Sequence, residues 1–172
     1  FWKLWVEKPV AFNNGYLVPA RKFRAAMLKS HGVNSHESAL SRREESSRRG
    51  EPTRPLRVGI ADRKHSILPE ICKKEPNRSP ACTRQVLNIP EAIKYIEAQA
   101  PGLFNMTVFD VRPGSSLDTN LHIFNAFDVL IGSEGAAFTN LMWMPLNSGL
   151  LILHGKFPGK VCHWHTSLAQ YY

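Results

Sequence analysis

The stretch from residue 126 to residue 153, AFDVLIGSEGAAFTNLMWMPLNSGLLIL, constrains the fold of this chain more than any other. Its apolar run Val129–Ile131 predicts a buried strand of a parallel sheet, and a glycine turn follows at residues 132–135. Residues 136–144 predict a helix that stops at the next proline, and residues 150–153 predict a second strand. A strand, a helix and a second strand make one crossover unit whose handedness is nearly fixed.

A glycine turn between a strand and a helix has two interpretations. Glycine lets the backbone approach a ligand, and the unpaired N–H groups of a helix N-terminus attract an anion. Alternatively, any α/β protein needs small residues where a strand turns into a helix. The glycines alone leave both interpretations open.

The composition is that of a soluble globular protein with one domain of ordinary size. The chain has 172 residues, of which 43% are hydrophobic and 21% are charged. It contains no apolar run of the roughly 18–20 residues that a membrane span needs, and no signal peptide. Because it opens on Phe1 without an initiating Met, we expect a fragment of a longer protein.

The net charge of +8 is unevenly distributed. Twelve Lys/Arg and five Asp/Glu lie between Arg21 and Lys64, so nearly all of the excess lies there. Residues 33–55 are rich in Ser, Arg and Glu and poor in large apolar residues, which predicts a disordered basic insert. An RNA-binding arm is the alternative, but interleaved glutamates and the absence of aromatic residues favour a solvated insert.

Five further elements follow from the spacing of apolar residues and the positions of Pro and Gly. In chain order they are a helix at 20–30, a strand at 56–61, a helix at 90–99, a strand at 105–111 and a helix at 117–127. In the first helix the expected apolar face holds Phe23, Ala25, Ala26 and Met27, and the opposite face holds Arg21, Lys22, Arg24 and Lys29. A hairpin is expected at 1–18 and a terminal helix at 161–172.

Cysteine, histidine and asparagine residues suggest a compartment but no metal site. Cys72 and Cys82 could close a loop and leave Cys162 free, or all three could be reduced. The segment Cys162–His165 does not match the usual zinc spacings, so surface or packing roles are favoured for it. Asn105-Met106-Thr107 is a glycosylation sequon, which favours a secretory lumen.

A basic segment follows the predicted strand at 56–61. Arg63, Lys64 and Ser66 come directly after its carboxyl end, where open α/β sheets bind their ligands. Arg offers a planar fork and Lys a compact charge, and together they suit a phosphate group. The alternative is that these residues are merely solvated.

In this order of elements the chain resembles the catalytic region of glycosyltransferase family 61, which includes plant xylosyl- and arabinosyltransferases and N-acetylglucosaminyltransferases of the endoplasmic reticulum. Residues 60–66, IADRKHS, are similar to the family's strand followed by Arg-Lys and then Arg or Ser. Residues 132–140, GSEGAAFTN, are similar to its Gly-x-His-Gly-Ala-x-x-Thr-Asn. The resemblance covers nearly everything except the insert at 33–55.

The resemblance implies a two-lobed GT-B enzyme whose Rossmann-like lobe, an α/β fold with a parallel sheet, holds a nucleotide-sugar. Residues 56–172 would form most of that lobe, and residues 1–32 would be the end of the N-terminal lobe with its flanking hairpin and helix. The implied activity is inverting sugar transfer from a UDP-sugar to a glycan or protein acceptor, with no metal or other cofactor. The implied location is the lumen of the Golgi or endoplasmic reticulum, with a membrane anchor in the parent chain and no nucleic-acid partner.

The residues and the resemblance agree on the donor site. Arg63 and Lys64 would neutralise the diphosphate, and the helix start at Gly135 would offer it backbone N–H groups. The complete set expected to bind the donor diphosphate is Arg63, Lys64, Ser66, Gly132, Ser133, Glu134, Gly135, Ala136, Thr139 and Asn140. The catalytic base is not identified.

Two residues depart from the family pattern. Glu134 stands where the family usually has His, and Ile152 stands where its last strand usually has Glu. The alternative hypothesis is therefore a catalytically degenerate, transferase-like binding module.

Overall fold

A computed structural model of the chain describes the elements that surround the predicted site. The described residues are 17–34, 49, 54–62, 86, 88–110, 114–133 and 135–153. Residues 17–18, expected to end a hairpin, belong instead to a helix. The rest of the expected hairpin, most of the insert, the terminal helix, the three cysteines and the histidines near the end lie outside the described residues.

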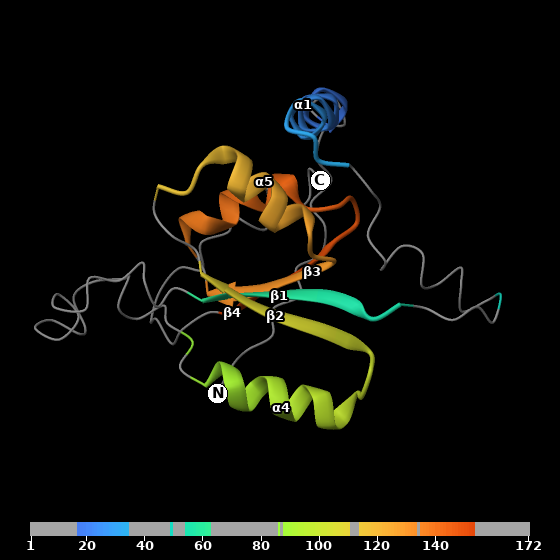
Figure 1. The fold of residues 1–172 in the computed structure, drawn as a ribbon, viewed down its shortest axis with the longest axis vertical. Helices are drawn as coiled ribbons and strands as arrows, with labels where there is room; N and C mark the ends of the chain where they lie inside the picture. Colours follow the sequence, from blue (N-terminus) through green and yellow to red (C-terminus); the bar gives the residue numbers. More distant parts are fainter. Residues whose placement is uncertain are drawn as a thin grey trace, which may run out of the picture.

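Within the described residues, four parallel strands form a sheet, in the order β2-β1-β3-β4 (Figure 1). They are β1 (Leu56–Asp62), β2 (Phe104–Asp110), β3 (Val129–Ser133) and β4 (Gly149–Leu153). Every neighbouring pair is parallel, and each strand begins and ends within two residues of its predicted position. The predicted class, an α/β fold with a parallel Rossmann-like sheet, is confirmed.

Helices cover both faces of the sheet. Helix α4 (Ile89–Gln99) lies on one face, and α5 (Leu117–Asn125) lies with the short helix η2 (Ala136–Trp143) on the other (Figure 1). Helix α1 (Leu17–Ser30) packs outside this second layer. Among the described helices, none combines the length and the apolarity needed to cross a membrane.

Local sequence signals explain where these helices start. Pro90 occupies the first turn of α4, where its missing N–H costs nothing. Ser116 caps α5, and its hydroxyl accepts a hydrogen bond from the Thr119 N–H at 3.1 Å. Both signals are visible in the sequence, and both helices form where they were predicted.

Two cores lie on the two faces of the sheet. On the α4 face, Leu56, Val58, Ile60 and Ile89 pack together. On the α5 face, the larger core joins α5, η2 and the inner side of α1, and three of its phenylalanines contact one another. The rings of Phe109 and Phe127 stack at 5.1 Å between centroids, and Phe109 meets Phe124 edge-on at 5.6 Å.

The predicted orientation of α1 is wrong in part, although Met27 packs against the larger core as expected. Phe23 is 52% exposed, whereas Arg24 is only 2% exposed and Leu28 is completely buried. The Arg24 guanidinium donates a hydrogen bond to the Met144 carbonyl oxygen at the end of η2. A buried face that runs through Leu28 includes the position four residues earlier, and a long side chain there can bury its stem while its head reaches a carbonyl.

The helix predicted at 136–144 is confirmed in position but differs in type. Residues 136–143 form a 3₁₀-helix, which is tighter than an α-helix and ends when Met144 becomes extended. The following turn contains Asn147 with a φ of 59°, a conformation that Asn tolerates better than most residues.

Both ends of the predicted insert belong to the ordered fold. Val33 is buried in the larger core, and the side chain of Arg54 binds Asp128. Residues 33–55 contain five arginines and four glutamates, so the segment is almost neutral and calling it basic was wrong. Much of the positive charge lies instead on α1, where Arg21, Lys22 and Lys29 are exposed.

Candidate functional site

The strand order creates one topological switch point. From β1 the chain passes through α4 to β2 on one side, and from β2 it returns through α5 to β3 on the other side of β1. The connections that leave the carboxyl ends of β1 and β3 therefore diverge, which opens a crevice where α/β proteins bind ligands. Ala61 is in register with Gly132, so these two strand ends lie level.

Gly132 lets η2 pack closely on the ends of the strands. A Cβ atom at this position would lie 3.0 Å from the Ala61 Cβ and 3.2 Å from the Phe138 Cζ. Phe138 belongs to η2 and is almost completely buried. A side chain at residue 132 would push η2 away from β1, so this glycine has a packing role as well as its place in the turn.

The N-terminus of η2 faces the carboxyl edge of the sheet. Gly135 precedes the helix and supplies no side chain to cap it, and its carbonyl accepts the Phe138 N–H at 3.0 Å. The N–H groups that precede Phe138 at the start of the helix have no carbonyl one turn earlier to which they could donate, so the positive end of the helix is suited to an anion. Anion binding at this turn stays a prediction.

Six of the ten predicted site residues belong to the part of the chain that the structure describes. Gly132, Ser133, Gly135, Ala136, Thr139 and Asn140 come from the end of β3 and from η2. Within η2, Thr139 is exposed and Asn140 is half-buried. The structure thus brings the glycine turn and the Thr-Asn pair onto one short segment beside the switch point.

The other four predicted residues, Arg63, Lys64, Ser66 and Glu134, lie outside the described residues. Their neighbours along the chain are placed. Asp62 ends β1 immediately before Arg63, and Ser133 ends β3 immediately before Glu134. Both segments therefore begin at the same edge of the sheet, but their side-chain positions stay a prediction.

The sequence analysis did not single out Asp62 and Asp110 as a pair. Each is the last residue of its strand, and the register of β1 and β2 sets them opposite each other at the carboxyl edge. The signal was present in the sequence, because Asp62 directly follows the strand predicted at 56–61 and Asp110 is the last residue but one of the strand predicted at 105–111. It could be used only once the two strands were known to be neighbours.

A buried ion-pair network lies at the opposite, amino edge of the sheet, and the sequence analysis missed it. Asp128 is completely buried, and both of its carboxylate oxygens accept hydrogen bonds from Arg54, at 2.7 and 2.8 Å. Arg57 adds its backbone N–H at 2.9 Å and its Nε at 3.2 Å. Because open α/β sheets bind ligands at their carboxyl edge, this network has a structural role.

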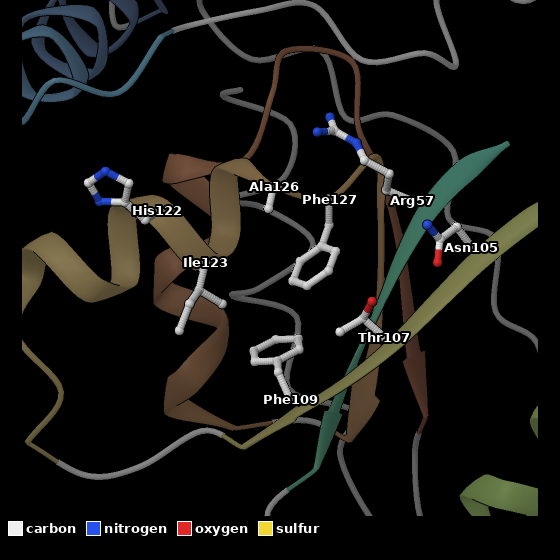
Figure 2. Close-up of a pocket in the computed structure, with 8 residues that line it drawn as sticks. All are labelled: Arg57, Asn105, Thr107, Phe109, His122, Ile123, Ala126 and Phe127. Atoms are coloured by element: carbon white, nitrogen blue, oxygen red, sulfur yellow. The ribbon is translucent and has the colours of Figure 1, made fainter. Parts of the chain in front are cut away.

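A groove of about 510 Å³ separates α5 from the outer strand β2 (Figure 2). Its floor is aromatic and its rim is polar. The lining residues are Arg57, Asn105, Thr107, Phe109, His122, Ile123, Ala126 and Phe127. The groove runs from the amino edge along the α5 face and is separate from the switch point.

An all-parallel sheet with helices on both faces and a glycine turn at its switch point defines a Rossmann-like α/β protein. The sequence model of the family described as glycosyltransferase 61 matches residues 18–151, from α1 into β4. The chain therefore belongs to glycosyltransferase family 61. No match was found among curated proteins.

Proposed function

We propose that the chain is the donor-binding lobe of a glycosyltransferase that moves a sugar from a UDP-sugar to a glycan or protein acceptor. One observation carries this proposal: β1 and β3 are parallel neighbours whose carboxyl ends are level, since Ala61 is in register with Gly132. The basic segment that follows β1 and the glycine turn that follows β3 therefore start side by side at the switch point.

The chemistry assigned to this site is stabilisation of a departing diphosphate. Arg63 and Lys64 supply positive charge, and the start of η2 supplies backbone N–H groups. The acceptor hydroxyl oxygen attacks the anomeric carbon from the face opposite the diphosphate. The new C–O bond forms as the bond to the diphosphate breaks, a general base takes the hydroxyl proton, and the configuration inverts. In this proposal fixed cations replace a metal ion.

The proposal places the enzyme in the lumen of the Golgi or endoplasmic reticulum, as a glycoprotein anchored through another part of its chain. It assigns the acceptor to a second lobe of a GT-B enzyme. The sequon at Asn105 and the family membership support this location.

A second candidate function is a degenerate module that binds a ligand without catalysis. Ile152 supports it, because this residue is the register partner of Gly132 and packs as an apolar side chain against the larger core. The departure from the family's Glu therefore lies directly beside the proposed site. Catalysis, and not the fold, distinguishes the two candidates.

Titration calorimetry of UDP into the full-length protein, in the presence of EDTA, tests the donor site. We expect binding of UDP but not of GDP, and we expect Arg63→Ala to weaken the UDP affinity at least about tenfold. The physical reason is that one charged hydrogen bond contributes about 1.5–3 kcal/mol. Arg21→Ala, on the exposed side of α1, is the matched control and keeps wild-type affinity.

Failure of a folded protein to bind either nucleotide would remove the basis for a transferase. Binding without turnover would favour the degenerate module. Turnover is measured as the release of UDP from UDP-sugars by the wild-type protein. Glu134→His, which restores the residue usual in the family, then tests whether that one charge blocks the donor chemistry.

A further inference from the structure

The sequon Asn105-Met106-Thr107 lies in strand β2. Its first and third residues, which glycosylation requires, lie on the same face of the strand. Side chains two residues apart in a strand share one face. Phe104 and Met106 face the α4 side, where they pack against the smaller core. Asn105 and Thr107 lie on the opposite face, and both are exposed. Figure 2 shows them in a row with Phe109 along β2.

Strand β2 is the outer strand of the sheet among the described strands, since it pairs with β1 on one side only. Its surface is partly apolar, with Val108 42% exposed. Beside it, the groove with its aromatic floor of Phe109 and Phe127 is open. An exposed edge strand of seven residues is a site at which chains pair and aggregate, and proteins usually cover or charge such edges.

Asn105 lies far from the proposed donor site. It is the second residue of β2, whereas the switch point is at the level of Asp110, the last residue. Five residues of strand span about 17 Å, at about 3.3 Å per residue. A bulky group on Asn105 therefore leaves the carboxyl edge open.

We propose that Asn105 carries an N-linked glycan that covers the outer edge of β2 and the mouth of the groove. This rests on the lumenal location in the proposed function. The Asn105 amide nitrogen forms a bond to the anomeric carbon of a lipid-linked oligosaccharide, and the carbon–oxygen bond to the lipid pyrophosphate breaks. The amide nitrogen loses one proton, and the lipid pyrophosphate leaves. The host's oligosaccharyltransferase catalyses this transfer.

The test uses the full-length protein with its own N-terminus, expressed in eukaryotic cells. A C-terminal tag carrying one Asn-Gly-Thr sequon reports entry into the lumen. The chain has a second sequon, Asn77-Arg78-Ser79, and Asn77→Gln is present throughout so that this sequon cannot contribute. The readout is the mass of the peptide that contains Asn105, before and after digestion with an N-glycosidase in water labelled with oxygen-18.

The glycan is expected on the parent chain and on Thr107→Ser, and it is expected to be lost in Asn105→Gln and in Thr107→Val. The serine keeps the hydroxyl that the sequon needs, whereas valine keeps the shape and removes it. An unmodified Asn105 overturns the proposal, whether or not the tag is modified. Modification that persists in Thr107→Val also overturns it.

The donor site is tested separately in the same proteins. UDP affinity is expected to be the same in Asn105→Gln and in the parent chain, because Asn105 lies near the amino edge of the sheet and the donor site lies at the carboxyl edge. A parent chain that binds UDP but carries no glycan on Asn105 overturns only the glycan proposal, whereas a glycosylated parent chain that does not bind UDP overturns only the donor-site proposal. Asn105→Gln is also expected to yield more aggregated material on size-exclusion chromatography.

Discussion

Among the described glycines with a negative φ, Gly59, in the middle of β1, leaves the least room for a side chain. A Cβ atom there would lie 2.5 Å from the Phe127 Cδ2 and 2.7 Å from its Cγ, far inside van der Waals contact. The Phe127 ring is held in turn by its stack with Phe109. The absence of a side chain at residue 59 therefore determines where the segment after α5 crosses the sheet.

We expect Gly59→Ala to lower the free energy of unfolding by about 1–3 kcal/mol, the range for overpacking in a core. Urea denaturation measures this loss as a lower midpoint with an unchanged m-value, which is the slope of the unfolding free energy against urea concentration. Combining it with Phe127→Leu identifies the cause. If the clash is with this ring, the double variant loses less stability than the sum of the single variants, whereas additive losses would contradict the assignment.

At the scale of elements, α1 is tied to the far end of η2. The buried Arg24 donates to the Met144 carbonyl, while the opposite end of η2 begins at Gly135 beside the switch point. A cation at the C-terminal end of a helix complements the helix dipole. Helix α1 therefore holds in place the element whose other end we assign to the donor.

We expect Arg24→Met to lower the free energy of unfolding by about 1–3 kcal/mol, because a buried carbonyl loses its charged donor. Amide hydrogen exchange should speed up in η2 more than in α4. Arg21→Met, which changes an exposed residue of the same helix, is the control and should stay within about 0.5 kcal/mol. Equal exchange in η2 for both variants would show that Arg24 does not hold this helix.

The strands were predictable because apolar runs bounded by Pro and Gly mark them almost without ambiguity. The 3₁₀ geometry of η2 could not be predicted. Over eight residues, the spacing of apolar side chains does not distinguish three residues per turn from the 3.6 residues per turn of an α-helix. The orientation of α1 failed for a different reason. An assignment from hydrophobicity alone places Arg24 on the exposed face. Leu28, four residues later on the same side of the helix, is nevertheless completely buried.

The candidate site was predictable where its residues are close in sequence. The glycine turn and the Thr-Asn pair lie within nine residues, from 132 to 140. The ion-pair network could not be predicted, because Asp128 is 74 and 71 positions away from Arg54 and Arg57. Only the strand order shows which distant segments meet.

At the scale of the whole molecule, Asp128 joins four segments at the amino edge of the sheet. Its carboxylate binds Arg54 and Arg57, its backbone N–H donates to the Arg57 carbonyl at 2.8 Å, and its carbonyl accepts the Gly149 N–H at 2.9 Å. The end of the insert and the starts of β1, β3 and β4 are thus connected through one residue.

We expect Asp128→Asn to lower the global free energy of unfolding by about 3 kcal/mol. This is the low end for breaking a buried ion pair, because both arginines stay partly exposed and water can solvate them. Chemical denaturation measures the loss. Asp118→Asn, at an exposed acid 3.2 Å from His31, should cost less than about 1 kcal/mol. Equal losses in the two variants would contradict a special role for the buried network.

The central place of β1 has a consequence for synthesis of the chain on the ribosome. Val58 pairs with Val129, which is made 71 residues later, and Leu56 pairs with Phe104. At about 5–20 residues per second, both edges of β1 wait several seconds for their partners. Among the described strands, the one on which the sheet is built is therefore the first to be made, and it must stay soluble until its described partners exist.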